Sequence, residues 1–201
     1  MRRILMTMTA ALLLGLTASA AVALTPTETV KSRVGEALSS LTQTSGPGTD
    51  ASEKRRAEIR KAADALFDFP DMSRRALGLH WKDRTPAERE EFTRLFTDLI
   101  ARTYIGKIDK YAGESIAYVG ERVDGDQASV RSNVITPKGS QIPVEYRMHR
   151  ANDTWSAYDV LIENVSLVGT YRSQFDRVIK AESFADLLRR LREKGQVAEA
   201  Q

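Results

Sequence analysis

Apolar positions recur at helical spacing in the first half of the chain. Three capping boxes, each with a side-chain oxygen followed three residues later by a Glu, predict helix starts at residues 25–28, 50–53 and 85–88. The third helix is expected to run from residue 86 to about residue 111, because its apolar stripe continues that far. A shorter helix is expected after Phe69 and Pro70, ending near Gly78.

The spacing changes to simple alternation after Gly113. It predicts four strands, over residues 115–123, 128–136, 141–150 and 155–165. The short turns between them imply an antiparallel meander with one covered face and one solvated face. Helical spacing then returns over residues 167–179 and 184–191. This order predicts an α+β fold in which helices pack on one face of a curled sheet.

The first 23 residues have the pattern of a cleavable signal peptide. Two arginines precede an apolar run, and small residues follow it at positions 18–23. The alternative, a membrane anchor, needs about 20 uninterrupted apolar residues, whereas Thr7, Thr9 and Gly15 break this run. We therefore expect residues 1–23 to be removed after export across a membrane, leaving residues 24–201 as one soluble domain.

Composition narrows the classes of function. Loss of two arginines from the 30 basic side chains leaves 28 against 27 acidic ones, so the mature chain offers no reason to expect nucleic acid as a partner. The sequence contains no cysteine, which excludes a disulfide scaffold, a thiol nucleophile and a lipoprotein anchor. The chain is expected to be free in solution.

Candidate catalytic chemistry is sparse. His80 and His149 are the only imidazoles, and together with nearby acids they give too few ligands for a metal site. Asp159 is a candidate general base if its carboxylate enters an apolar pocket, as in some curled-sheet enzymes. The alternation of side chains along the strand favours the other interpretation, in which Asp159 lies on the face of the sheet opposite its neighbours Tyr158 and Val160 and pairs with an arginine such as Arg131 or Arg147.

An ordered set of motifs covers residues 25–192 and resembles the MlaC or toluene-tolerance family of periplasmic phospholipid-binding proteins. The motifs are FDF at 67–69, MSRRALG at 72–78, TPAER at 85–89, IPVEYRM at 142–148, WSAYDV at 155–160 and ENVSLV at 163–168. The resemblance implies an NTF2-like or cystatin-like curled sheet closed by C-terminal helices around an apolar cavity. It also implies a non-enzymatic shuttle protein without a cofactor, whose carried ligand is phospholipid.

The resemblance further implies partners, and we expect the concave apolar face of the sheet and the helix from residue 86 to about residue 111 to enclose the acyl chains. The shuttle is expected to work as a monomer between an inner-membrane ABC transporter, with its lipid-binding receptor subunit, and an outer-membrane lipoprotein complex, maintaining lipid asymmetry in the outer membrane. Cations expected to flank the headgroup are Arg74, Arg75, Arg102 and Lys107. Residues expected to line the lipid-binding cavity are Tyr104, Ile108, Val144, Tyr146, Met148, Tyr158, Val160 and Ile162.

Two alternatives come from other classes of protein. A pocket enzyme of NTF2-like type would need Asp159 inside the cavity, whereas a carrier would have it on the other face. A non-lipid envelope adaptor would have a filled core and no cavity large enough for acyl chains. The position of Asp159 and the size of the cavity therefore distinguish the three hypotheses.

Overall fold

The computed structural model describes residues 24–43, 49–108 and 113–193. The predicted signal peptide lies outside these ranges. Within them, no helix is both long enough and apolar enough to cross a membrane.

Three long helices begin where the sequence predicts. They are α1 (Pro26–Gln43), α2 (Thr49–Leu66) and α4 (Pro86–Ile108). The capping box of α1 is reciprocal: the Glu28 amide donates to Thr25 Oγ1 at 3.2 Å, and the Thr25 amide donates to Glu28 Oε2 at 2.8 Å. Thr85 and Glu88 form the same pair at the start of α4. In the expected α2 box, Asp50 lies outside the residues whose side chains the structure describes, and Glu53 is exposed.

Shorter helices complete the helical part. They are α3 (Phe69–Leu77), the 3-10 turn η1 (Gly78–Trp81), α5 (Leu167–Ala181) and α6 (Phe184–Arg192). Asp68 caps α3 by accepting a hydrogen bond from the Asp71 amide at 2.9 Å. The predicted end of α3 is confirmed, since Gly78 has φ +58° and its amide donates to the Arg74 carbonyl.

The sheet is an antiparallel meander of order β1-β2-β3-β4-β5. Its strands are β1 (Ser115–Asp124), β2 (Gln127–Ile135), β3 (Gln141–Ala151), β4 (Thr154–Ile162) and β5 (Val165–Ser166). The fourth predicted strand is therefore two, because Glu163 and Asn164 adopt φ +50° and +66° and turn the chain back. The predicted α+β class is confirmed.

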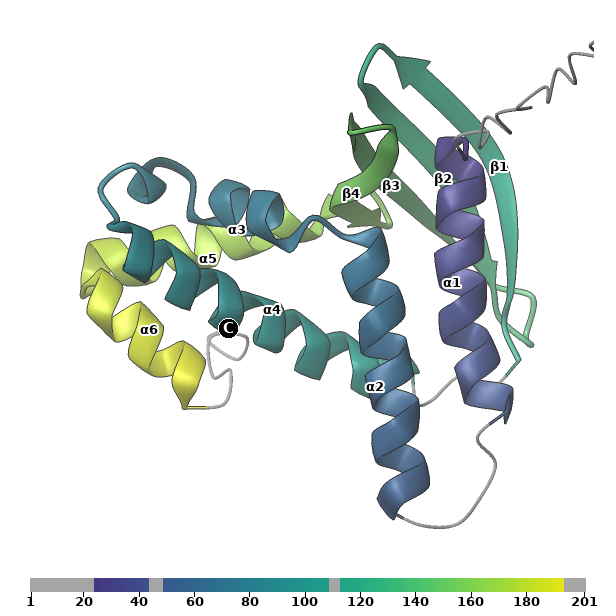
Figure 1. Cartoon of the computed structure of the whole chain (residues 1–201), viewed down its shortest axis with the longest axis horizontal. Coiled ribbons are helices and arrows are strands. Elements are labelled where there is room, and N and C mark those ends of the chain that lie inside the picture. The colour runs from purple at the N-terminus through teal and green to yellow at the C-terminus, as the bar shows by residue number, and fades with distance from the viewer. Residues whose placement is uncertain (1–23, 44–48, 109–112, 194–201) are drawn as a thin grey trace, which may run out of the picture.

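The helices fall into two groups around the sheet. In Figure 1, α1 and α2 stand side by side at the sheet, whereas α3 to α6 form a separate helical body that meets the sheet at β4. One buried cluster, centred on Phe92, Phe96 and Phe175, belongs to that helical body. A second, centred on Val130 and Met148, lies between α1, α2 and the sheet. The space between the two clusters is where the candidate site lies.

Candidate functional site

Two apolar cavities lie between the helices and the inner face of the sheet. The larger, the α1–α2 cavity, has a volume of about 480 Å³ and is bounded by α1, α2, the end of α4 and strands β1 to β3. Arg33, Glu114 and Thr136 are the residues with strongly polar side chains in its wall. The other lining residues are Val34, Ala37, Leu38, Ile59, Ala62, Ala63, Leu66, Phe67, Tyr104, Ile116, Val134, Ile142 and Tyr146.

The smaller α4 cavity has a volume of about 280 Å³ and lies between α2, α3, α4 and strands β3 and β4. Arg60 is its one charged lining residue, and Arg60 bonds to Asp64 at 3.1 Å and to Asp98 at 3.4 Å. The remaining wall is formed by Ala63, Phe67, Phe69, Met72, Ile100, Ala101, Tyr104, Val144, Tyr146, Val160, Ile162 and Leu167.

The two cavities share one wall. It is formed by Ala63 and Phe67 from the C-terminal half of α2 and its junction with α3, Tyr104 from α4 and Tyr146 from β3. Burial raises the pKa of the Tyr104 hydroxyl to about 12, with Tyr171 nearby as a second cause, and raises the pKa of Tyr146 well above its ordinary value. Both hydroxyls are therefore uncharged at neutral pH, so the shared wall carries no charge.

Five of the eight residues expected to line a cavity do so. Tyr104 and Tyr146 line both cavities, and Val144, Val160 and Ile162 line the α4 cavity. Their strands are in register, with Val144 opposite Ile162 and Tyr146 opposite Val160, so four of the side chains form one continuous patch. Ile108 ends α4 where the structure describes the backbone alone.

Tyr158 was expected on the inner face, and the structure contradicts this. The pairing of β3 with β4 shifts register between Arg147 and Met148, so that Arg147 faces Asp159 while Met148 faces Ala157. Tyr158 is the extra residue of this bulge, and a bulge reverses the alternation of faces beyond it. Its ring instead lies 3.9 Å from Arg75 Cζ.

Met148 was also expected to line a cavity and does not line either of the two described here. Its side chain is fully buried in the cluster between the sheet, α1 and α2, where it packs with Val130 and Ala157. Met148 faces the interior as predicted, but at this end of β3 the side chains of Trp155 and Leu66 fill the space. Periodicity identifies a buried face without showing whether the space behind it is filled.

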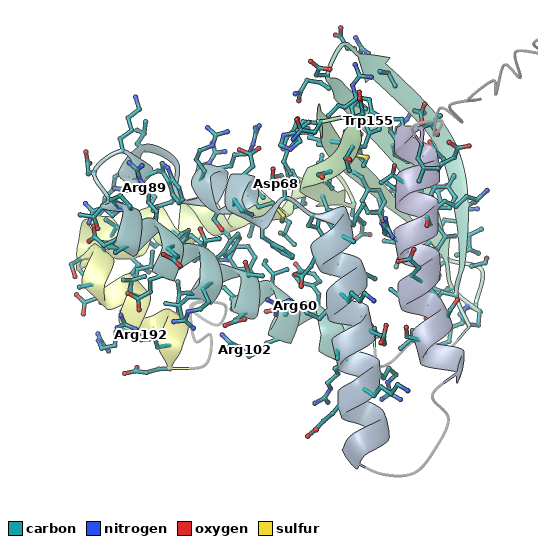
Figure 2. The ribbon with its side chains drawn as sticks, in the orientation of Figure 1. Arg60, Asp68, Arg89, Arg102, Trp155 and Arg192 are labelled. Carbon is teal, nitrogen blue, oxygen red and sulfur yellow. The ribbon has the colours of Figure 1, made fainter. Side chains whose placement is uncertain are left out.

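Three of the four cations expected to flank the headgroup, Arg74, Arg75 and Arg102, line neither apolar cavity. Arg74 and Arg75 border a groove against η1 and α5 and line neither apolar cavity. Arg102 Nη2 donates to the Leu191 carbonyl at 3.4 Å, and Figure 2 shows it toward the end of α6. Lys107 belongs to the end of α4, where only the backbone is described. The cations that do line the cavities are Arg33 and Arg60, which the sequence did not single out.

Asp159 lies on the face of the sheet opposite the cavities. Its carboxylate accepts hydrogen bonds from Ser166 Oγ at 2.6 Å and from the Val168 amide at 3.1 Å, and it lies 3.8 Å from Arg147 Nη1. Ser166 is in turn the N-cap of α5. The predicted pairing with Arg147 is confirmed, and the group fixes α5 to β4. The pocket-enzyme hypothesis required this carboxylate inside the cavity, and that requirement is not met.

The fold and the cavities together define a class: small α+β proteins with apolar space enclosed between a curved antiparallel sheet and the helices that cover it. A model of the MlaC protein family matches residues 31–193. The chain belongs to the MlaC family.

Two relatives extend the comparison. The phospholipid-binding protein of Ralstonia solanacearum, whose structure contains a phospholipid, superposes with a TM-score of 0.72 and 26% identity over 85% of this chain and 97% of that one. The intermembrane phospholipid transport system binding protein MlaC of Haemophilus influenzae is 26% identical over 99 residues, which is 47% of this chain and 46% of that protein. The match thus spans about half of the Haemophilus protein.

Proposed function

We propose that the chain is a phospholipid-binding shuttle protein of an ABC-type intermembrane lipid transport system. It works in the periplasm after cleavage of residues 1–23 and maintains lipid asymmetry in the outer membrane. Its partners are an inner-membrane ABC transporter with a lipid-binding receptor subunit and an outer-membrane lipoprotein complex. The named functions of the Ralstonia and Haemophilus relatives support this proposal.

The observation that carries the proposal is the pair of apolar cavities. Two acyl chains of about 16 carbons exposed to water cost roughly 25 kcal/mol, at about 0.8 kcal/mol per methylene. A carrier therefore has to replace water with an apolar wall along most of each chain. At roughly 30 Å³ per methylene, by analogy with the volume of a water molecule, the α1–α2 cavity holds about 16 methylenes and the α4 cavity about nine.

These sizes favour a cargo with two apolar chains. One chain fits fully into the α1–α2 cavity, and about half of a second fits into the α4 cavity, with the shared wall of Ala63, Phe67, Tyr104 and Tyr146 between them. Arg33 is the cation in the wall of the larger cavity, and it pairs with Glu36 at 2.9 Å. The non-lipid adaptor hypothesis requires a filled core, which two cavities of this size argue against.

The test is the lipid content of the purified protein. Protein isolated without detergent is extracted with organic solvent, and the extract is analysed by mass spectrometry for phospholipid. We expect close to one diacyl phospholipid per chain, and we expect the delipidated protein to take up lipid from vesicles. Protein that carries no lipid and takes none from vesicles would refute the carrier proposal.

A further inference from the structure

A groove on the helical body, apart from the two apolar cavities, has a strongly cationic wall. It has a volume of about 550 Å³ and lies between α3, η1 and α5. Its lining contains five permanently cationic side chains and one carboxylate, Asp176, although the mature chain as a whole is nearly neutral. The cations are Arg74, Arg75, Lys82, Arg172 and Lys180.

Three of these five cations form local ion pairs, with two carboxylates between them. Asp71 bonds to both Arg74 and Arg75 from α3, and Lys180 Nζ lies 2.8 Å from Asp176. Arg172 Nε donates to the Arg75 carbonyl at 2.9 Å, so its partner there is a neutral group. Lys82 is exposed, and no described residue forms an ion pair with it. The groove therefore retains an excess of positive charge after its ion pairs are counted.

The turn η1 presents Leu79 at the edge of this groove. Leu79 is 87% exposed, which is the largest value among the exposed large apolar side chains of the described chain. A single exposed leucine is ordinary on a protein surface. Leu79 differs because it lines the same groove as the cations, so that an exposed apolar side chain and positive charges border one surface.

Contacts with α4 and α5 hold the turn that carries Leu79 in place. Arg89 of α4 donates to the Trp81 carbonyl at 3.1 Å and to the Lys82 carbonyl at 3.2 Å, and Figure 2 shows Arg89 at this turn. His80 Nε2 lies 2.9 Å from Asp176 Oδ1 on α5. Trp81 packs against the core of the helical body. Leu79 thus lies on a turn that is held in place by the hydrogen bonds of Arg89 and by the contact of His80 with Asp176.

We propose that the groove and Leu79 dock the protein on the surface of a phospholipid bilayer that bears anionic headgroups. Cations near such a surface are attracted to it, and an apolar side chain among them enters the boundary between headgroups and acyl chains. This combination favours a bilayer over an acidic protein patch, which would satisfy the cations but leave Leu79 without an apolar contact. The docking surface is separate from the apolar cavities and does not depend on the cargo they hold.

The test is co-flotation of the full chain with two kinds of vesicle at low salt. One kind is phosphatidylcholine alone, and the other is phosphatidylcholine with phosphatidylglycerol in equal parts. We expect association with the anionic vesicles only, and its loss at high salt because the charges are then screened. Lys82→Gln is expected to weaken this association about fivefold, and Leu79→Ser about tenfold.

Matched controls are available on the sheet. Lys138 is exposed in the turn between β2 and β3, and Val123 is 49% exposed at the end of β1. Lys138→Gln and Val123→Ser are expected to bind the vesicles like the unaltered protein. Equal effects of Lys82→Gln and Lys138→Gln would overturn the proposal, as would equal association with neutral and anionic vesicles.

Absence of any vesicle association would also overturn the proposal and would leave an acidic protein surface as the partner for this groove. The phospholipid content of each variant is measured in parallel. We expect Lys82→Gln and Leu79→Ser to keep their phospholipid while losing vesicle association. That result separates docking from cargo binding, so that a failure of either proposal can be recognised without the other.

Discussion

Ala63 offers a direct way to test whether the cavities hold the cargo. It lies on α2 in the wall shared by both cavities, and its half-buried side chain borders open space rather than packed atoms. Ala63→Phe adds a phenyl ring of six carbon atoms, which would occupy space otherwise available to acyl chains. Because the ring fills a cavity, the free energy of unfolding of the lipid-free protein is expected to stay unchanged or to rise.

The expected loss of affinity follows from the volume taken. Six methylene equivalents at about 0.8 kcal/mol each give roughly 5 kcal/mol as an upper limit. The cargo can shift and the walls can relax, so about half of that loss is expected to persist. A loss of about 2.5 kcal/mol corresponds to a dissociation constant roughly 70-fold higher.

The assay compares phospholipid per chain by mass spectrometry, and then lipid uptake from vesicles by the delipidated protein. Ala87→Phe is the matched control, because Ala87 is exposed in the first turn of α4 and lines neither cavity. It should bind lipid like the unaltered protein. If Ala63→Phe folds, is as stable as the parent and carries a full complement of diacyl lipid, the cavities are not the binding site.

Three other predictions concern the fold. Gly78→Ala is expected to lower the free energy of unfolding by about 1–3 kcal/mol, because Gly78 has φ +58°. Gly35→Ala in the middle of α1 meets no atom within 4 Å and should raise the free energy of unfolding by about 0.5–1 kcal/mol. Urea unfolding of both variants checks that the two changes have opposite signs. Asp159→Ala is expected to lower the free energy of unfolding by about 2–4 kcal/mol, because its carboxylate holds Ser166 and the start of α5. Asp126→Ala, which removes an exposed ion pair, is expected to lower it by at most about 1 kcal/mol. Equal losses in the two variants would contradict the role of Asp159 in fixing α5 to β4. Burial raises the pKa of Tyr104 from 10.0 to about 12, so the unfolded chain loses the Tyr104 proton first and the free energy of unfolding falls as pH rises from 10 to about 12. Tyr104→Phe should make this fall less steep in thermal melts recorded across that pH range. An unchanged slope would refute the raised pKa of Tyr104.

Much of the fold could be predicted because local patterns and tertiary packing agree. The capping residues Thr25 and Thr85 fix the starts of α1 and α4, and the alternation from Ile142 to Met148 fixes the inner face of β3. Both patterns depend on residues close together in the sequence. They also led correctly to Tyr146 as a residue at the cavities.

The site could be predicted less well, because it depends on irregularities and on filled volume. The bulge at Tyr158 reverses a strand face through one extra residue, and nothing in the alternation of residues 155–165 marks where that residue lies. Apolar faces containing Val34 on α1 and Ile59 on α2 are visible as helical stripes, yet spacing alone does not show that they border an unfilled cavity. Arg75 could not be placed because its position depends on the packing of α3 against α5.

The hydrophobic interior is divided into two clusters, and this division bears on how the cavities affect the free energy of unfolding. The helical cluster and the cluster at the sheet each consist of buried apolar side chains, and Phe67 is a partly buried side chain that packs against both. The residues of each cluster contribute to stability through neighbours within that cluster. A change in the spacing of the two clusters would therefore alter the cavity volume mainly at the expense of bridging contacts such as those of Phe67. Leu66, Met72 and Ile100 belong to the clusters and also line the cavities, so a substitution at these residues would change cavity size and thermodynamic stability together.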